Sequence, residues 1–90
     1  MRTTIYKYPL EISGGDLQTV MMPAGAQLLH FGVQRGVLCV WAKVVLDFTP
    51  TPRQFRVFGT GWELGINCGQ HRGTAFAGPY VWHVFEVDPL

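Results

Sequence analysis

Short runs of alternating apolar and polar residues fill this chain, and Gly or Pro ends most of them. No stretch has the spacing of a long helix. Such runs bury one side of a β-strand, and the Gly and Pro residues between them supply turns. The pattern predicts an all-β chain, with room for one short helical turn between Trp62 and Gln70. It predicts a single domain, residues 1–90, in which a small antiparallel meander forms a barrel or a two-layer sandwich.

The clearest piece of architecture is a hairpin from Gln27 to Leu46, whose strands flank Arg35 and Gly36. A two-residue loop there pairs Val33 with Leu38, Phe31 with Val40, and Leu29 with Ala42. One face then holds only apolar side chains, namely Leu29, Phe31, Val33, Leu38, Val40, Ala42 and Val44. A three-residue loop would bring Cys39, Trp41 and Lys43 to that face, because a shift of one residue turns every side chain over. Burial of a lysine is unfavourable, so the two-residue loop is favoured.

Further strands are predicted from β-branched and aromatic composition at Thr3 to Leu10, Leu17 to Met22, Arg53 to Phe58, Gly73 to Phe76, and Tyr80 to Val87. The segment from Thr49 to Pro52 contains two prolines, which cannot donate to a ladder, and is expected to be a stiff, exposed connection. Gly59-Thr60-Gly61 is expected to end the strand that precedes it.

The chain carries much apolar surface and little charge. Hydrophobic residues make up 48% of it and charged residues 14%, against about 25% charged in ordinary domains. So small a domain has difficulty hiding this surface, which favours cover by a partner protein or by a second copy in a homodimer or higher oligomer. The net charge of +1 argues against direct nucleic-acid binding, which needs a strongly basic surface.

No secretory signal and no membrane-crossing run is apparent in the sequence, so no membrane association is expected. The only cysteines, Cys39 and Cys68, are then better interpreted as free thiols in a reducing compartment than as a disulfide. These features predict a cytoplasmic location.

The outer face of the hairpin is the first candidate site. In the favoured register it carries Leu28, His30, Cys39, Trp41 and Lys43, with His30 opposite Trp41. Aromatic and cationic side chains on a rigid sheet are typical of binding hot spots. The predicted partner-binding residues are Trp41, His30, Lys43 and Trp62.

A small-ligand site is the alternative. Its loops would be Gly59-Thr60-Gly61 and Arg72-Gly73-Thr74, because glycines let main-chain N–H groups turn toward one anion and threonine adds a hydroxyl. Arg53, Arg56 and Arg72 would neutralise a phosphate. The GxxxxGK[ST] motif of P-loops is missing, and glycines also serve bulges and tight turns.

Metal binding and catalysis are both disfavoured by the residue pattern. Cys68 and His71 have a metal-like spacing, but structural zinc needs four ligands and no second close pair follows. Cys68 beside His71 or His83 could act as a nucleophile, yet no orienting carboxylate is evident in the sequence. The chain is therefore predicted not to be an enzyme, and no cofactor or metal is expected.

A family resemblance adds to this interpretation. The successive segments that carry it are Ile5-Tyr6-Lys7-Tyr8, Met22-Pro23-Ala24-Gly25-Ala26, Trp41-Ala42, Gly59-Thr60-Gly61, Gly73-Thr74 and His83-Val84-Phe85-Glu86. Their order resembles a family of short, uncharacterised β-rich proteins encoded mainly by bacteriophages, prophages and their bacterial hosts; Trp62 to His71 departs from the pattern. The resemblance implies a small phage-type accessory protein and carries no established activity with it. Together with the low charge, the excess apolar surface and the missing catalytic constellation, it favours a non-enzymatic protein that binds a host protein, with inhibition of a defence system such as CRISPR as one outcome of that binding. Alternatives are an oligomer that binds a nucleotide signal, and a virion or assembly component.

Overall fold

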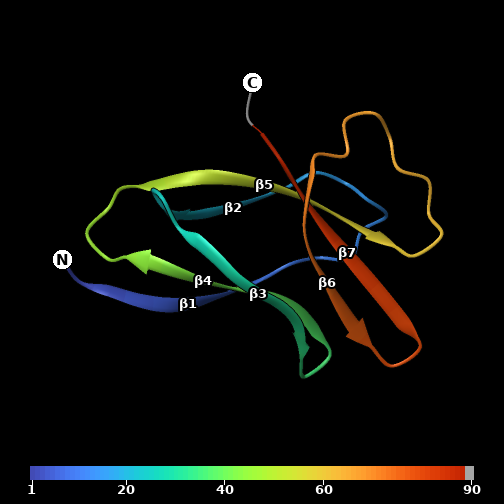
Figure 1. Ribbon diagram of the computed structural model, residues 1–90, viewed down its shortest axis with the longest axis horizontal. Coiled ribbons are helices and arrows are strands. Elements are labelled where there is room, and N and C mark those ends of the chain that lie inside the picture. The colour runs from blue at the N-terminus through green and yellow to red at the C-terminus, as the bar shows by residue number, and fades with distance from the viewer. Residues whose placement is uncertain (89–90) are drawn as a thin grey trace.

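The computed structural model describes residues 1–88 and contains only strands, turns and loops (Figure 1). Its seven strands are β1 (Thr3–Pro9), β2 (Gln18–Pro23), β3 (Gln27–Gln34), β4 (Val37–Val45), β5 (Pro50–Gly59), β6 (Gln70–Ala77) and β7 (Tyr80–Val87). The all-β prediction is confirmed. The segment between Trp62 and Gly69 is irregular, and the helical turn for which the sequence left room does not form there.

The strands form two antiparallel sheets, one with the order β1-β4-β3 and the other with the order β2-β5-β7-β6. The arrangement is a sandwich rather than a closed barrel. Hairpins join β3 to β4 and β6 to β7, whereas the pairs β1-β4, β2-β5 and β5-β7 join strands that are separated along the chain. In Figure 1, β3 crosses from the start of β5 toward β6. Strands β3 and β6 are edge strands of different sheets and lie against each other.

The hairpin of β3 and β4 confirms the two-residue loop. Val33 faces Leu38 and Phe31 faces Val40. Arg35 and Gly36 have positive φ angles of 52° and 78°, as a type I′ turn requires.

The predicted pairing of Leu29 with Ala42 is wrong. A β-bulge between Leu28 and His30 makes Leu28 the partner of Ala42 instead. Leu28, which was expected on the outer face, packs against the core, and Leu29 is 47% exposed. The extra residue reverses the alternation, so the apolar face is completed by Leu28 rather than Leu29.

Strand β5 begins at Pro50, so the prediction that Thr49 to Pro52 is a connection outside the sheet is wrong in part. Pro50 and Pro52 face Pro23 and Met21 of β2. Pairing with β7 begins only at Gln54, so both prolines lie where β5 has a neighbour on one side. Pro is tolerated there because its missing N–H would face no partner strand.

The remaining strand limits differ from the predictions mainly at β6. This strand begins at Gln70 rather than Gly73, because a bulge between His71 and Gly73 accommodates its irregular start. Strand β7 has the predicted bounds, and β5 ends at Gly59 as expected.

The core lies between the two sheets. Its largest fully buried side chains are Phe55, Met22, Leu38, Val40, Val44, Val57 and Val84. These residues come from the inward faces of β2, β4, β5 and β7. Phe58, on the opposite side of β5 from Phe55, is also buried, beneath the loop at Gly15 and edge-on to Phe85.

Gly73 lies where β3 and β6 approach each other closely. A Cβ atom at this position would lie 2.3 Å from Cδ2 of Phe31, whose side chain is only 4% exposed. We expect Gly73→Ala to lower the free energy of unfolding by about 1–3 kcal/mol, since overpacking displaces a buried ring. Denaturant unfolding measures this effect. Gly65→Ala is the control, because nothing lies within 4 Å of a Cβ there; equal losses in both variants would contradict the expectation.

Candidate interaction surface

The outward side of the β1-β4-β3 sheet gathers the predicted binding residues of the hairpin. Ile5 faces Lys43, Lys7 faces Trp41, and His30 faces Trp41. Because directly opposed residues share a face, these five side chains form one surface, which we name the basic-aromatic face. Ile5 is 58% exposed, both lysines and His30 are exposed, and Trp41 is half-buried. The other sheet packs on the opposite side.

The rings of His30 and Trp41 lie together across two strands of this face. Their centroids are 5.8 Å apart with a tilt of 42°. Gly32 makes room for them, since a Cβ there would lie 2.9 Å from Nε2 of His30 and 3.6 Å from Cζ3 of Trp41. A side chain at position 32 would therefore displace the imidazole, and the glycine lets both rings settle on the sheet.

Cys39 was expected to be exposed on this face, and that expectation is wrong, because only 2% of it is exposed. Nζ of Lys7 donates a hydrogen bond to Oε1 of Gln34 at 2.8 Å. Lys7 of β1 faces Trp41, and Gln34 of β3 faces Val37. The hydrogen bond therefore joins β1 to β3 across β4, and Cys39 lies between Val37 and Trp41 on β4. Sγ of Cys39 donates to the carbonyl of Val37 at 3.5 Å. Cys68, the other free thiol, is half-buried in the loop before β6.

The charge of the β1-β4-β3 sheet is of one sign. None of its three strands contains Asp or Glu, and all three lie within the described part of the chain. Lys7 and Lys43 stand on the basic-aromatic face, and Arg35 at the tip of the hairpin adds a third cation. The near-neutral charge of the whole chain thus conceals a locally basic face, which attracts acidic groups.

Trp62 lies elsewhere. It packs edge-on against Trp82 of the β2-β5-β7-β6 sheet, with ring centroids 5.7 Å apart. It also lies over Gly59, where a Cβ would come within 2.8 Å of the indole. Tyr80 stacks on Trp82 at 5.7 Å. The structure therefore brings together three of the four predicted partner-binding residues and places Trp62 in a separate aromatic cluster.

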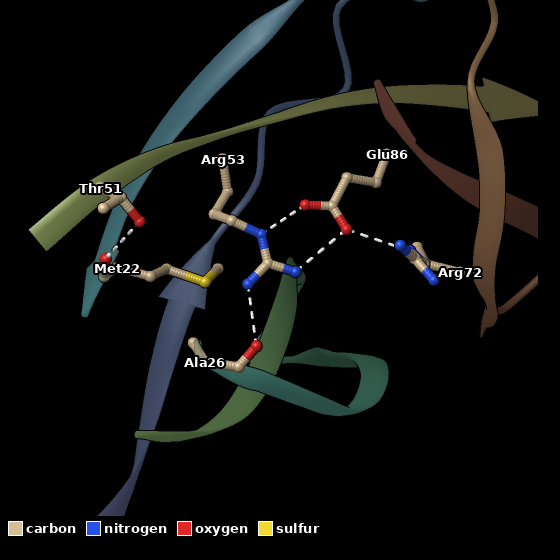
Figure 2. Close-up of polar contacts among 6 residues, drawn as sticks. All are labelled: Met22, Ala26, Thr51, Arg53, Arg72 and Glu86. Atoms are coloured by element: carbon tan, nitrogen blue, oxygen red, sulfur yellow. Dashed lines mark hydrogen bonds and ion pairs between the residues drawn. The ribbon is translucent and has the colours of Figure 1, made fainter. Parts of the chain in front are cut away.

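The arginines proposed for a phosphate are engaged within the protein. Nε and Nη2 of Arg53 donate to the two carboxylate oxygens of Glu86, and Nη1 donates to the carbonyl of Ala26 at 2.8 Å (Figure 2). Nε of Arg72 donates to Oε1 of Glu86 at 3.0 Å. The Glu86 side chain is only 8% exposed. Arg53 and Arg72 thus converge on one carboxylate that β7 holds between them.

The pKa of Glu86 is set by two opposing effects. Burial alone would raise this pKa, but the hydrogen bonds and positive charges of Arg53 and then Arg72 outweigh it, so the pKa lies below its usual value. The hydrogen bond to Glu86 raises the pKa of Arg53 and outweighs the opposing effect of burial. The carboxylate is therefore ionised at neutral pH and structural in role.

Arg56 points to a different place from the other two arginines. Its Nη1 donates to the carbonyl of Gly15 at 2.9 Å, and its buried Nε has no partner. It borders an open depression of about 740 Å³ that Asn67 and Asp88 also line. Within residues 1–88, no carboxylate forms an ion pair with Arg56. The three arginines therefore do not converge on one anion.

The two segments predicted as ligand-binding loops meet through His83, but Arg72, Gly73 and Thr74 lie within β6 rather than in a loop. Oγ1 of Thr60 lies 2.6 Å from Nε2 of His83, and Oγ1 of Thr74 lies 3.1 Å from Nδ1 of the same ring. Thr74 also contacts Nε2 of His71 at 3.1 Å. Both nitrogens of His83 are thus satisfied by hydroxyl groups rather than oriented by a carboxylate. Residues 1–88 contain no group of three or more His, Cys, Asp or Glu side chains placed to hold a metal ion.

These features define a small two-sheet β-domain with a basic-aromatic face on one sheet. The chain matches, over residues 1–90, the family model described as Domain of unknown function (DUF7352), and it belongs to that family. No curated protein and no solved structure matches the chain. The described residues form no helix that is long and apolar enough to cross a membrane.

Proposed function

We propose that this protein is a non-enzymatic binding protein that docks a partner protein on the basic-aromatic face. The observation that carries the proposal is the grouping of Trp41, His30 and Lys43 on one open sheet surface, together with Ile5 and Lys7. Trp is enriched among residues that dominate binding energy. Its ring is already held by the sheet, so little conformational freedom is lost on docking.

The charge of the basic-aromatic face supports a partner that carries acidic groups. Lys7, Lys43 and Arg35 face no carboxylate within their own sheet. A partner that presents acidic side chains around an apolar centre would complement them. Electrostatic attraction of this kind chiefly raises the association rate and weakens with salt.

The resemblance to phage and prophage proteins supports a bacterial host protein as that partner. A protein that acts by contact alone inhibits its target by covering a functional surface. We therefore propose a phage-type accessory protein that occludes a host protein, with a defence system such as CRISPR as the target class. The engagement of Arg53 and Arg72 by Glu86 weighs against the small-ligand alternative, because both guanidinium groups already hydrogen-bond to one carboxylate. Co-purification with virus particles would instead identify an assembly component.

The test is capture of a host protein by immobilised wild type and variants. We expect Trp41→Ala to weaken capture of one and the same protein roughly 30-fold, corresponding to about 2 kcal/mol. The single variant Lys43→Glu should also weaken capture, and its effect should be largest at low salt. Phe76→Ser is the matched control, because Phe76 is 75% exposed and lies on the other sheet. Circular dichroism verifies that each variant is folded. Equal capture by all four proteins would refute the proposal.

A further inference from the structure

Strand β2 is an open edge of the β2-β5-β7-β6 sheet. Among residues 1–88 it pairs with β5 alone (Figure 1). Apart from that ladder, no main-chain hydrogen bond within residues 1–88 involves Thr19 or Met21. An open edge of this kind is a template for another strand.

The prolines of β5 show which β2 groups are unpaired. In an antiparallel ladder, opposed residues alternate between exchanging both N–H···O bonds and exchanging none. Met21 faces Pro52, which has no N–H, so this pair exchanges none. Met22 and Val20 therefore bond toward β5, and the N–H and C=O groups of Thr19 and Met21 point away from it.

Contacts at both ends of β5 agree with this assignment. Oγ1 of Thr51 donates to the carbonyl of Met22 at 3.4 Å, so that carbonyl points toward β5. The N–H of Thr60 donates to the carbonyl of Val81 at 3.2 Å, so the even-numbered residues of β5 bond toward β7 and the odd-numbered ones toward β2.

The two open edges of the molecule differ chemically. Leu10 donates its N–H to the carbonyl of Leu38, so the even-numbered residues at this end of β1 bond toward β4. The outward groups of β1 thus belong to Ile5, Lys7 and Pro9 among others, and a lysine and a proline are typical protection against edge pairing. Strand β2 has no charged residue and no proline before its last position.

We propose that a second copy of this chain pairs antiparallel with β2. With the two-fold axis at Val20, Thr19 of each copy faces Met21 of the other. Each such pair exchanges both of its bonds, so the outward N–H and C=O groups of Thr19 and Met21 are all satisfied. Met21, now 54% exposed, would be covered by the second copy.

The resulting dimer joins two four-stranded sheets into one continuous sheet. The basic-aromatic face belongs to the other sheet of each copy and stays open. The proposal therefore stands independently of the proposed function. It also gives the dimer two such faces, which increases apparent affinity for a multivalent partner.

Light scattering of the full chain across a concentration series tests the pairing. We expect wild type to be dimeric at high concentration and Met21→Pro to be monomeric, since Pro removes an outward N–H and no bond to β5. Ile5→Pro makes the same change on the β1 edge and should remain dimeric. Hydrogen exchange should show the amides of Thr19 and Met21 protected in wild type, and the amide of Thr19 exchanging rapidly in Met21→Pro, which has no amide hydrogen at position 21.

The double variant Thr19→Lys/Met21→Lys keeps the experiment informative if the proline variant does not fold. Both side chains are exposed, so the lysines leave the monomer intact and bring like charges together in the dimer. A monomeric wild type would overturn the proposal. So would a dimer that persists in both β2 variants, or one that only Ile5→Pro disrupts.

Discussion

Replacing Glu86 with Ala is expected to lower the free energy of unfolding by about 3–5 kcal/mol, because it removes the buried carboxylate that pairs with two arginines. Most of this loss comes from the unpaired charge of Arg53, because its side chain is only 21% exposed. The Arg72 side chain is 36% exposed and reaches water more easily. A domain of this size has only about 5–15 kcal/mol in total. Denaturant unfolding of both proteins at neutral pH measures the loss.

Asp47→Ala is the control for this variant. Asp47 pairs with Arg2 at 2.8 Å, but their side chains are 63% and 73% exposed, so its loss should change stability by no more than about 0.5 kcal/mol. A comparable loss from both variants would show that the interior position of Glu86 does not matter.

The same ion network predicts how stability depends on pH. The pKa of Glu86 is lower in the folded state than the value of about 4.3 for an unfolded chain. The unfolded chain therefore binds the proton first as pH falls, and stability decreases below about pH 5. Glu86→Gln should reduce this decrease in stability at low pH, whereas Asp47→Ala should leave the decrease unchanged.

Phe55→Ala is expected to cost about 3–5 kcal/mol as well, for a different reason. Phe55 is fully buried between the sheets, so its loss removes apolar burial and leaves a cavity. Phe76→Ala makes the identical chemical change at a ring that is 75% exposed, and it should leave stability within about 0.5 kcal/mol. Thermal and denaturant unfolding compare the two. Similar unfolding midpoints for the two variants would contradict the burial of Phe55 in the core.

The parts of the fold that were predictable depend on local signals. The β3-β4 hairpin follows from the Arg35-Gly36 turn and from the cost of burying Lys43. Strand β7 follows from a run of alternating residues between turn signals. The bulge in β3 has no such signal, because Leu28 and Leu29 are chemically identical and only the packing of both sheets selects between them.

The candidate site was predictable in part for the same reason. Trp41, His30 and Lys43 share a hairpin, so their common face follows from one local register. Ile5 and Lys7 join them through pairing of strands far apart along the chain, and periodicity alone does not specify that pairing. The partners of Glu86 lie 33 and 14 residues away, and no spacing rule links them.

The bulge in β3 also makes position 29 one at which the chain could be shortened by a residue without a change in strand register. Leu28 and His30 face Ala42 and Trp41, which are adjacent in β4, so Leu29 has no counterpart across the ladder. Removing that residue would leave both neighbours opposite the same partners. We therefore expect members of the family to tolerate the loss of a residue here without a change in which side chains face the core, and their alignments to show a gap at position 29 more readily than elsewhere in the hairpin.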